Sequence, residues 1–387
     1  AADAPGSPFP AAWKLKDAGT AVVDVGGRPA VALTLTLGGE VCDLEARFTA
    51  HPGTPIIRLD ARIVGVAENG VTLPSVTPYR LSLDTAGAPA TVYWMTNGGS
   101  VSLAREQVAP GLKRTLDGSA TAPLLPWLGL TTDGRGGVFA SLEYLGRWSL
   151  NASSEDGKAV TMAATVAETA GRPLGRGARV LLPSLVLGVF ESTLDDMSRH
   201  VYDWQYEYLW DLTNPDHYAK TRWATEWFVG GLCLQDQFTG RVAAAGLDAV
   251  ERARDAGYDM LWDDAGWTTT VPTPGTEKPD FWKPKDGPDF SPLLKLVEKQ
   301  GMDWNLWIAG NPDLGQMSNY AGSWGNFEWR TDMVAFPDFP TERGWKEMVE
   351  TWLRAHPRCA YHTCGCGGTY SHNFDIQRLA TVNYMAD

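Results

Sequence analysis

The pattern of apolar residues changes near residue 191, and this change divides the chain into two regions with different secondary structure. Before it, apolar and polar residues alternate with a period of two, as in residues 30–37 and 55–64, and glycine-rich turns separate the runs. A period of two places one set of side chains on a core face and the other towards solvent. Short strands with frequent turns and no helical stretch predict an antiparallel β-sandwich over residues 1–190.

A helix is expected to follow the sandwich. Ser192 or Thr193 can cap its N-terminus, and Asp195 and Asp196 fall in its first turn, near the positive end of the helix dipole. We predict that residues 191–220 form this helix and the connection to the second region.

From residue 221 onwards, short apolar runs alternate with helical patterns. The predicted strands are residues 224–229, 258–262, 304–309, 327–334, 359–363 and 382–386, and the predicted helices include residues 292–300, 345–355 and 374–379. This alternation indicates a parallel sheet, in a barrel or in a doubly wound arrangement. We predict a multidomain β plus α/β protein, in which residues 221–387 form an incomplete (β/α)8 TIM-type barrel with about six strands. We expect the natural protein to continue beyond Asp387.

Carboxylates gather where the predicted parallel strands end. Asp263 and Asp264 close the second strand, Asp332 lies near the end of the fourth, and Asp387 ends the sixth. One aspartate at such a position is most often a helix cap, but four of them on three strands favour a shared site. In a TIM barrel the active site is built at these strand ends. Because paired carboxylates across a cleft are the equipment that cleaves glycosides, the sequence predicts a site of that kind.

Several short motifs resemble those of one enzyme clan and occur in the same order along nearly the whole chain. Residues 263–267 (Asp-Asp-Ala-Gly-Trp) resemble its Asp-Asp-Gly-Trp motif with one alanine inserted, and residues 330–332 (Arg-Thr-Asp) resemble its Lys-x-Asp motif. Residues 364–368 resemble its Cys-x-x-Gly-Gly turn. Further similar segments are residues 142–148, 305–308 and 383–387. In these features the chain resembles the α-galactosidase clan, in particular the members that join a β-sandwich to a barrel.

The resemblance implies a retaining glycoside hydrolase that cleaves terminal α-linked galactose-like sugars. In the clan, the aspartate at the position of Asp332 attacks the anomeric carbon, and the one at the position of Asp387 is the acid/base. The residues implied in substrate binding are Asp263, Asp264, Trp267, Trp307, Arg330, Cys364, Gly367 and Gly368.

Two departures from the clan motifs bear on the identity of the sugar. Arg330 replaces a lysine, and a guanidinium is a planar fork of donors that can grip vicinal hydroxyls and hold Asp332 ionised. The additional Ala265 moves the loop that carries Trp267 by one residue. Both changes leave the sugar open more than they question glycoside cleavage.

Two other classes of function compete with this prediction. The altered motifs would suit a non-catalytic carbohydrate-binding protein with a degenerate barrel site. A metal-dependent isomerase or lyase would need histidines beside the carboxylates at the strand ends, and the sequence lacks them there. Zinc at Cys364 and Cys366 would need His362 or His372 to complete its ligands, so a small-residue turn is favoured. We expect no metal and no cofactor.

The composition limits the partners of the chain. A net charge of -13 disfavours nucleic acid, and no apolar run approaches the roughly 18 residues of a membrane span. The 17 tryptophans suit a carbohydrate partner, because an indole offers a flat apolar face to a sugar ring. The small residues at the start, Ala1 and Ala2, suit a mature N-terminus after signal cleavage, so we expect a secreted or extracytoplasmic protein. The oligomeric state is left open.

Overall fold

The structure is a computed structural model of the 387-residue chain. It describes residues 13–97, 101–119, 124–133, 136–209, 224–225, 250–258, 260–263, 291–309, 315, 317–318, 327–332, 336, 338–363, 373–379 and 382–383. Two compact units make up the chain. The sandwich unit contains Ala1–Asp211, Phe336–Arg343 and His372–Asp375, and the parallel-sheet unit contains Leu212–Ala335, Gly344–Ser371 and Ile376–Asp387. The domain limits expected at residues 190 and 220 stay predictions.

The sandwich unit is built from antiparallel sheets, as predicted. A nine-stranded sheet has the order β1-β2-β3-β4-β15-β11-β10-β7-β8, and a four-stranded sheet has the order β6-β13-β12-β9. The strands of the first are β1 (Lys14–Val25), β2 (Arg28–Gly38), β3 (Cys42–Ala50), β4 (Ile56–Gly65), β7 (Ala90–Asn97), β8 (Val101–Gln107), β10 (Leu124–Thr132), β11 (Gly136–Glu143) and β15 (Arg179–Phe190). Those of the second are β6 (Val76–Asp84), β9 (Leu112–Gly118), β12 (Trp148–Ser154) and β13 (Ala159–Val166). The short strands β5 (Val71–Thr72) and β14 (Pro173–Leu174) pair with each other.

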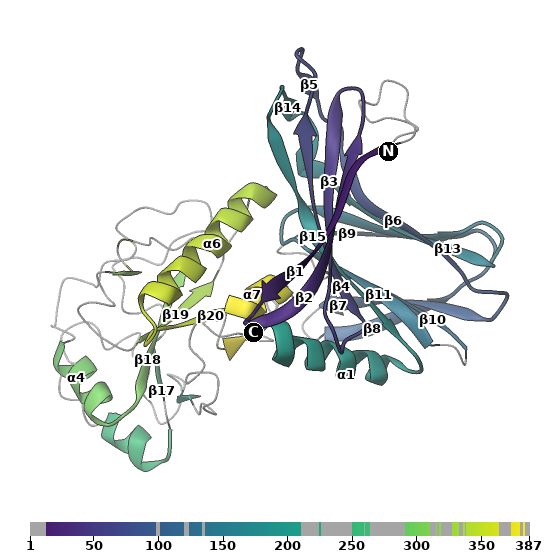
Figure 1. Cartoon of the computed structure of the whole chain (residues 1–387). Helices are drawn as coiled ribbons and strands as arrows, with labels where there is room; N and C mark the ends of the chain where they lie inside the picture. The colour runs from purple at the N-terminus through teal and green to yellow at the C-terminus, as the bar shows by residue number, and fades with distance from the viewer. Residues whose placement is uncertain are drawn as a thin grey trace. The chain divides into compact units, whose positions relative to one another are not determined.

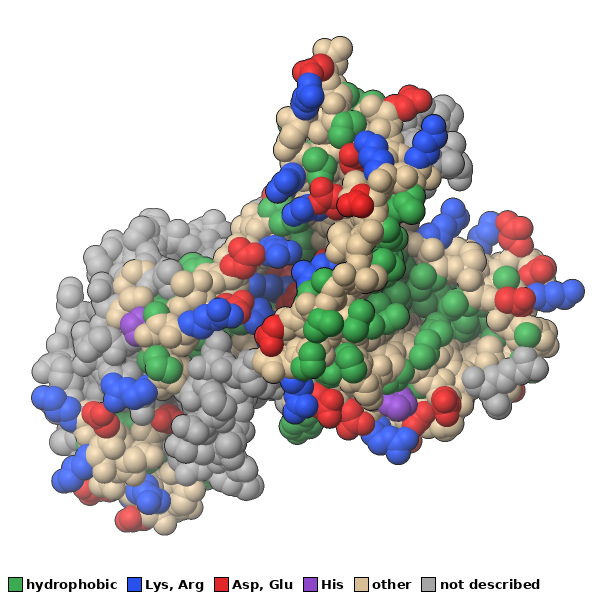
Figure 2. Space-filling model, in the orientation of Figure 1, with side chains coloured by type: hydrophobic (Ala, Val, Ile, Leu, Met, Phe, Trp, Pro, Cys, Tyr) green, Lys and Arg blue, Asp and Glu red, His purple; other side chains and the backbone are tan. Residues whose placement is uncertain are grey.

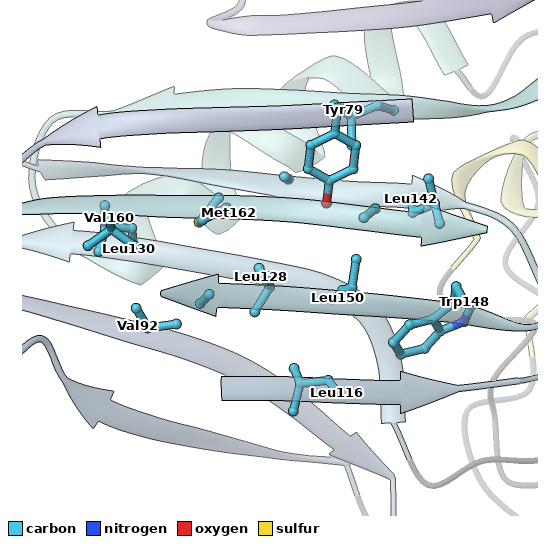
Figure 3. Packing of buried hydrophobic residues seen from close by; sticks show 14 of the residues in the cluster. Tyr79, Val92, Leu116, Leu128, Leu130, Leu142, Trp148, Leu150, Val160 and Met162 are labelled. Atoms are coloured by element: carbon cyan, nitrogen blue, oxygen red, sulfur yellow. The ribbon is translucent and has the colours of Figure 1, made fainter. Parts of the chain in front are cut away.

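The space between the two sheets is filled mainly by apolar side chains. Alternate residues of β12 and β13 are buried, including Leu150 and Met162, each with 0% of its surface exposed. They meet Val92 and Leu128 of the larger sheet in one cluster, and Figure 3 shows the labelled side chains of both sheets sharing this space. Each such side chain stabilises the fold by about 1.5–3 kcal/mol relative to exposure. The sandwich is therefore held mainly by hydrophobic burial.

Apolar side chains also appear on the surface of this unit. The hairpin of β1 and β2 exposes Leu15, Val22 and Val31, and Val22 is 74% exposed. Figure 2 shows apolar side chains gathered on the face of the sandwich unit that this view presents. The sheet therefore continues past the core as a hairpin whose apolar residues meet solvent.

The predicted helix follows the last strand of the sandwich. Helix α1 (Leu194–Trp204) is capped by Thr193, whose hydroxyl accepts a hydrogen bond from the Asp196 backbone N–H. It runs directly into a π-helix (Gln205–Leu209). Buried residues of the two helices pack with Ile56 and Val186 of the nine-stranded sheet. This element therefore closes the outer face of that sheet (Figure 1).

The second unit contains the predicted parallel sheet. Its six strands are β16 (Ala224–Thr225), β17 (Met260–Asp263), β18 (Asp303–Ala309), β19 (Phe327–Asp332), β20 (Ala360–Thr363) and β21 (Val382–Asn383). They are all parallel and lie in the order of the sequence. The helices are α4 (Ser291–Lys299), α6 (Phe339–Ala355) and α7 (Phe374–Leu379). Closure of this sheet into a barrel stays a prediction.

Helix α6 begins six residues earlier than the expected start at residue 345. Asp338 precedes it and accepts hydrogen bonds from the backbone N–H and the hydroxyl of Thr341, at 2.9 and 2.7 Å. Pro340 is tolerated because the first turn of a helix needs no backbone donor there. The sequence prediction was wrong at this end because it followed the apolar stripe and not the cap.

Candidate active site at the ends of the parallel strands

The register of the parallel sheet places the candidate site residues in rows. Trp307 of β18 is paired with Arg330 of β19, and Ala309 is paired with Asp332, the last residue of β19. Arg330 is also paired with His362 of β20. Because side chains alternate along a strand, Trp307, Arg330 and Asp332 belong to one face of the sheet. The structure thus brings together, on adjacent strands, three residues that the sequence singled out.

The other predicted site residues are placed less completely. Asp263 is the last residue of β17, as expected. It pairs with Leu306, which precedes Trp307 in β18. Because side chains alternate along a strand, Asp263 belongs to the face of the sheet opposite to that of Trp307. The remaining six lie outside the described residues: Asp264, Trp267, Cys364, Gly367, Gly368 and Asp387. Their roles stay predictions.

The same face carries three buried polar side chains, of which His362 is level with Arg330 and the other two lie two residues nearer the start of their strands. Asn305, Glu328 and His362 are 0%, 1% and 2% exposed. Asn305 Nδ2 lies 3.1 Å from His362 Nδ1, and Glu328 Oε1 lies 3.5 Å from the same nitrogen. Asn305 is paired with Glu328 across the sheet. A carboxylate, an imidazole and an amide therefore form one contact group across β18, β19 and β20.

The opposite face of these strands is closed by packing against a helix. Trp329, Thr331 and Tyr361 are at most 1% exposed. The hydroxyls of Thr331 and Tyr361 are hydrogen-bonded to each other. The Tyr361 ring meets Trp345 of α6 edge to face, with 5.8 Å between ring centroids. Helix α6 therefore covers this face. Glu328, Arg330 and Asp332, which alternate with Trp329 and Thr331 along β19, belong to the other face.

Segments that follow β19 and β20 in the chain carry polar groups that are bound within the sandwich unit. Arg58 donates from Nη1 and Nη2 to the two carboxylate oxygens of Asp375, at 2.6 and 2.9 Å. The Asp375 backbone N–H donates to Glu143 Oε2 at 3.1 Å, and Glu143 is fully buried. Burial lowers the pKa of Arg58, but the carboxylates of Asp375 and Asp60 outweigh burial and hold it well above its ordinary value. Arg58 therefore stays charged and binds Asp375 as a bidentate pair.

The segment Phe336–Arg343 is bound in a similar way. Arg172 forms an ion pair with Asp338, and the Leu145 backbone N–H donates to Glu342 Oε2 at 2.9 Å. Burial raises the pKa of Asp338, but the hydrogen bonds from Thr341 and Arg172 outweigh it and lower that pKa below its ordinary value. Residues 142–148, noted in the sequence only for their resemblance to a clan motif, thus supply partners to both segments.

In comparisons with known sequences, no family model matches the chain and no curated protein matches it significantly. Solved structures do match. The galactosidase domain of AgaSK, an α-galactosidase–sucrose kinase, superposes with a TM-score of 0.77 at 12% identity, over 97% of this chain and 61% of that chain.

The chain has the α-galactosidase fold. The α-galactosidase from Lactobacillus brevis gives a TM-score of 0.70 at 14% identity, over 97% of this chain and 60% of that chain. A variant of the GH36 α-galactosidase AgaA from Geobacillus stearothermophilus, solved with raffinose, gives 0.72 at 12% identity, over 97% and 62%. The chain thus spans less than two thirds of the length of these α-galactosidases. The resemblance to the α-galactosidases is confirmed at the level of the fold.

Sequence reasoning missed the buried polar groups beside the candidate site. His362 was considered only as a zinc ligand, whereas the structure places it beside Asn305 and Glu328. No group of three or more His, Cys, Asp or Glu residues arranged to hold a metal ion occurs in the described part of the chain. The available signal was the spacing of Glu328, Arg330 and Asp332 at every second position, since it puts three charged residues on one face of a strand.

Among the described helices, none is both long and apolar enough to cross a membrane.

Proposed function

We propose that this protein is a retaining glycoside hydrolase that removes terminal α-linked galactose-like sugars, with Asp332 as nucleophile and Asp387 as acid/base. The observation that carries the proposal is the place of Asp332. It is the last residue of β19, in a parallel sheet of a chain whose fold matches α-galactosidases over 97% of its length. Active sites of (β/α)8 barrels lie at this end of the strands, and we propose that the sheet is part of such a barrel.

The reaction follows from two carboxyl groups with opposite protonation. The Asp332 carboxylate attacks the anomeric carbon and forms an ester bond, while the glycosidic C–O bond breaks and Asp387 gives its proton to the departing oxygen. Asp387, now ionised, then takes a proton from water as that water attacks the anomeric carbon. The ester bond breaks, the sugar leaves with retained configuration, and both aspartates return to their first state.

Residues around the two acids are proposed to bind the sugar. Arg330 precedes Asp332 by two residues on the same strand face, where a cation favours the ionised form of the nucleophile. Trp307 belongs to the same row of the sheet as Arg330. By resemblance, sugar contacts are also assigned to Asp263, Asp264, Trp267, Cys364, Gly367 and Gly368. One structural neighbour was solved with raffinose, an oligosaccharide that ends in an α-linked galactose, which supports a carbohydrate substrate.

The test is hydrolysis of a panel of aryl α- and β-glycosides by the full-length natural protein and by Asp332→Ala. We expect cleavage of the α-galactoside and a loss of roughly 10⁴-fold or more in Asp332→Ala, since the missing nucleophile removes the covalent route. Azide should restore turnover in that variant and yield a β-configured galactosyl azide, identified by NMR. Unchanged turnover in Asp332→Ala would reject Asp332 as the nucleophile.

The second candidate is a carbohydrate-binding protein without activity. The replacement of the motif lysine by Arg330 and the insertion of Ala265 favour it, because both alter residues that the clan uses at its site. Calorimetric titration with raffinose separates the two. Binding of raffinose by a wild-type protein that cuts no member of the glycoside panel would establish this alternative.

A further inference from the structure

Three buried polar side chains join the strands that carry the proposed site. Asn305, Glu328 and His362 lie on β18, β19 and β20, are at most 2% exposed, and approach one another at 3.1 and 3.5 Å around His362 Nδ1. We call them the polar row. No step of the proposed reaction uses any of the three.

Burying these groups has a cost that the structure needs to offset. A buried carboxylate loses its hydration, and a pair of buried charged groups is often less stabilising than apolar residues of the same volume. The opposite face of the same strands shows that the sheet accepts large packed side chains, because Trp329 and Tyr361 are fully buried there. A polar row on the other face therefore indicates a requirement beyond stability.

The position of the polar row relates it to Asp332. Glu328 precedes Asp332 by four residues on the same strand face, and His362 is level with Arg330 in the register. A strand advances by about 3.3 Å per residue, so Glu328 and Asp332 are roughly 13 Å apart along β19. The polar row thus crosses three strands, between the level of Glu328 and the level of Arg330, which precedes Asp332 by two residues.

We propose that Glu328, His362 and Asn305 are positioning residues that hold β19 in register with β18 and β20, so that the strand presents Asp332 at its end in the geometry for attack. The proposal rests on the assignment of Asp332 as the nucleophile. The hydrogen bond between Asn305 and His362 and the contact of Glu328 with the same nitrogen fix these side chains more narrowly than apolar contacts do, because a donor and an acceptor have a preferred direction. Catalysis needs such precision, since a displacement of about 1 Å can reduce a rate by roughly 100-fold.

The test compares variants of the two faces of the same strand pair. Glu328→Gln keeps the shape of the side chain and removes its charge, and His362→Leu removes both ring nitrogens. His362→Asn retains an amide near the position of Nδ1 and serves as the conservative rescue. Tyr361→Phe is the matched control, since it removes the hydrogen bond to Thr331 on the opposite face of β19 and β20.

Activity is measured per functional site in the full-length protein. Each variant is treated with a galactose-configured mechanism-based inactivator, and mass spectrometry gives the labelled fraction and the labelled residue. We expect Glu328→Gln and His362→Leu to lower kcat per labelled site by about 10- to 100-fold with KM changed less than about threefold. His362→Asn should recover most of kcat. Tyr361→Phe should lower the thermal midpoint and leave kcat per labelled site within about twofold.

The outcomes separate this inference from the proposed function. Labelling of Asp332 in the wild type, with equal kcat per labelled site in Glu328→Gln, His362→Leu and Tyr361→Phe, would overturn the positioning role alone. If His362→Leu fails to fold, the kcat per labelled site of Glu328→Gln, which keeps the shape of the side chain, still decides whether the polar row has a positioning role. Absence of both labelling and glycoside cleavage in the wild type would overturn the proposed function, and this inference with it.

Discussion

The two units of this protein differ in what fills the interior of their sheets. The sandwich interior consists of side chains such as Leu128, Leu150 and Met162, each 0% exposed. The parallel sheet buries Asn305, Glu328 and His362 on one face instead. Apolar residues lower the free energy of the fold directly, whereas buried polar groups do so only when their partners offset the lost hydration. The sandwich is thus stabilised mainly by apolar burial, whereas the parallel sheet also contains buried polar groups whose lost hydration their partners have to offset.

The sandwich unit also buries two acids. Its buried acids Glu143 and Glu342 bind or belong to the segments His372–Asp375 and Phe336–Arg343. These segments follow β20 and β19 in the chain. Among the described residues the buried carboxylates are Glu143, Glu328 and Glu342, and each lies on a strand of the proposed site or binds or belongs to a segment that continues from one. The comparison teaches that buried carboxylates, and not buried polar groups in general, accompany the strands of the proposed site in the described part of the chain.

The largest expected effect on stability comes from the apolar interior of the sandwich. Leu150→Ala should lower the free energy of unfolding by about 2–5 kcal/mol, because it removes buried surface and leaves a cavity between the two sheets. Hydrogen exchange read by mass spectrometry should show the loss in peptides of β12 and β13. Leu103→Ala is the matched control, since Leu103 is 49% exposed and its loss should change stability by less than about 0.5 kcal/mol. Equal effects of the two would contradict an apolar interior as the main source of stability.

A smaller effect is expected from the exception in the same unit. Arg58→Met leaves Asp375 and the buried Glu143 without their cation. We expect a loss of about 2–3 kcal/mol, below the range for fully buried pairs because the side chains of Arg58 and Asp375 are 20% and 17% exposed. Urea unfolding monitored by circular dichroism measures it.

The control for Arg58 is an exposed ion pair of the same sheet. Arg62 pairs with Glu45, and their side chains are 40% and 28% exposed. Arg62→Met should cost less than about 1 kcal/mol, since solvent screens such a pair. Similar losses of unfolding free energy in Arg58→Met and Arg62→Met would show that burial adds nothing to the stability contributed by the Arg58 pair. Buried polar groups of the sandwich unit would then behave like exposed ones.

Local patterns in the sequence were enough to predict the antiparallel sheets and the parallel sheet, whereas closure of the latter into a barrel stays a prediction. The period of two found the antiparallel strands, the alternation of strands and helices found the six parallel strands in order, and Thr193 marked the start of α1. Each of these signals lies within a few residues of the chain. The resemblance in short motifs then led to the α-galactosidase fold, although sequence identity to the matched structures is only 12–14%.

Interactions between distant residues could not be predicted in the same way. Arg58 and Asp375 are separated by 317 positions, and Asn305 and His362 by 57. Nothing in the sequence around Arg58 distinguishes it from Arg62, which lies four residues further along the same strand and meets a different partner. The partner of a charged residue depends on which strands become neighbours, and that is a property of the complete fold.

The smallest expected effect sharpens the comparison through pH. His51 is 3% exposed and its ring meets Trp204 and Tyr208 at centroid distances of 5.6 and 5.0 Å. Burial lowers the pKa of His51 below its ordinary value of 6.5, although a hydrogen bond to the Ile56 carbonyl opposes this; nearby Arg58 lowers it further and Asp60 raises it. An apolar environment of this kind favours the neutral imidazole.

The sign of the pH effect follows from this direction. Below the ordinary value of 6.5 the unfolded chain binds a proton at His51 that the folded chain does not. The stability contributed by neutral His51 is therefore complete above that value and is lost as pH falls towards the lowered pKa of the folded state. His51→Gln lacks this loss, so the difference in unfolding free energy between wild type and variant should shrink between pH 8 and pH 5.5, measured in urea. Carboxylates common to both proteins cancel in this difference. Parallel pH profiles would mean that His51 titrates alike in both states, and that the apolar packing around it does not exclude charge.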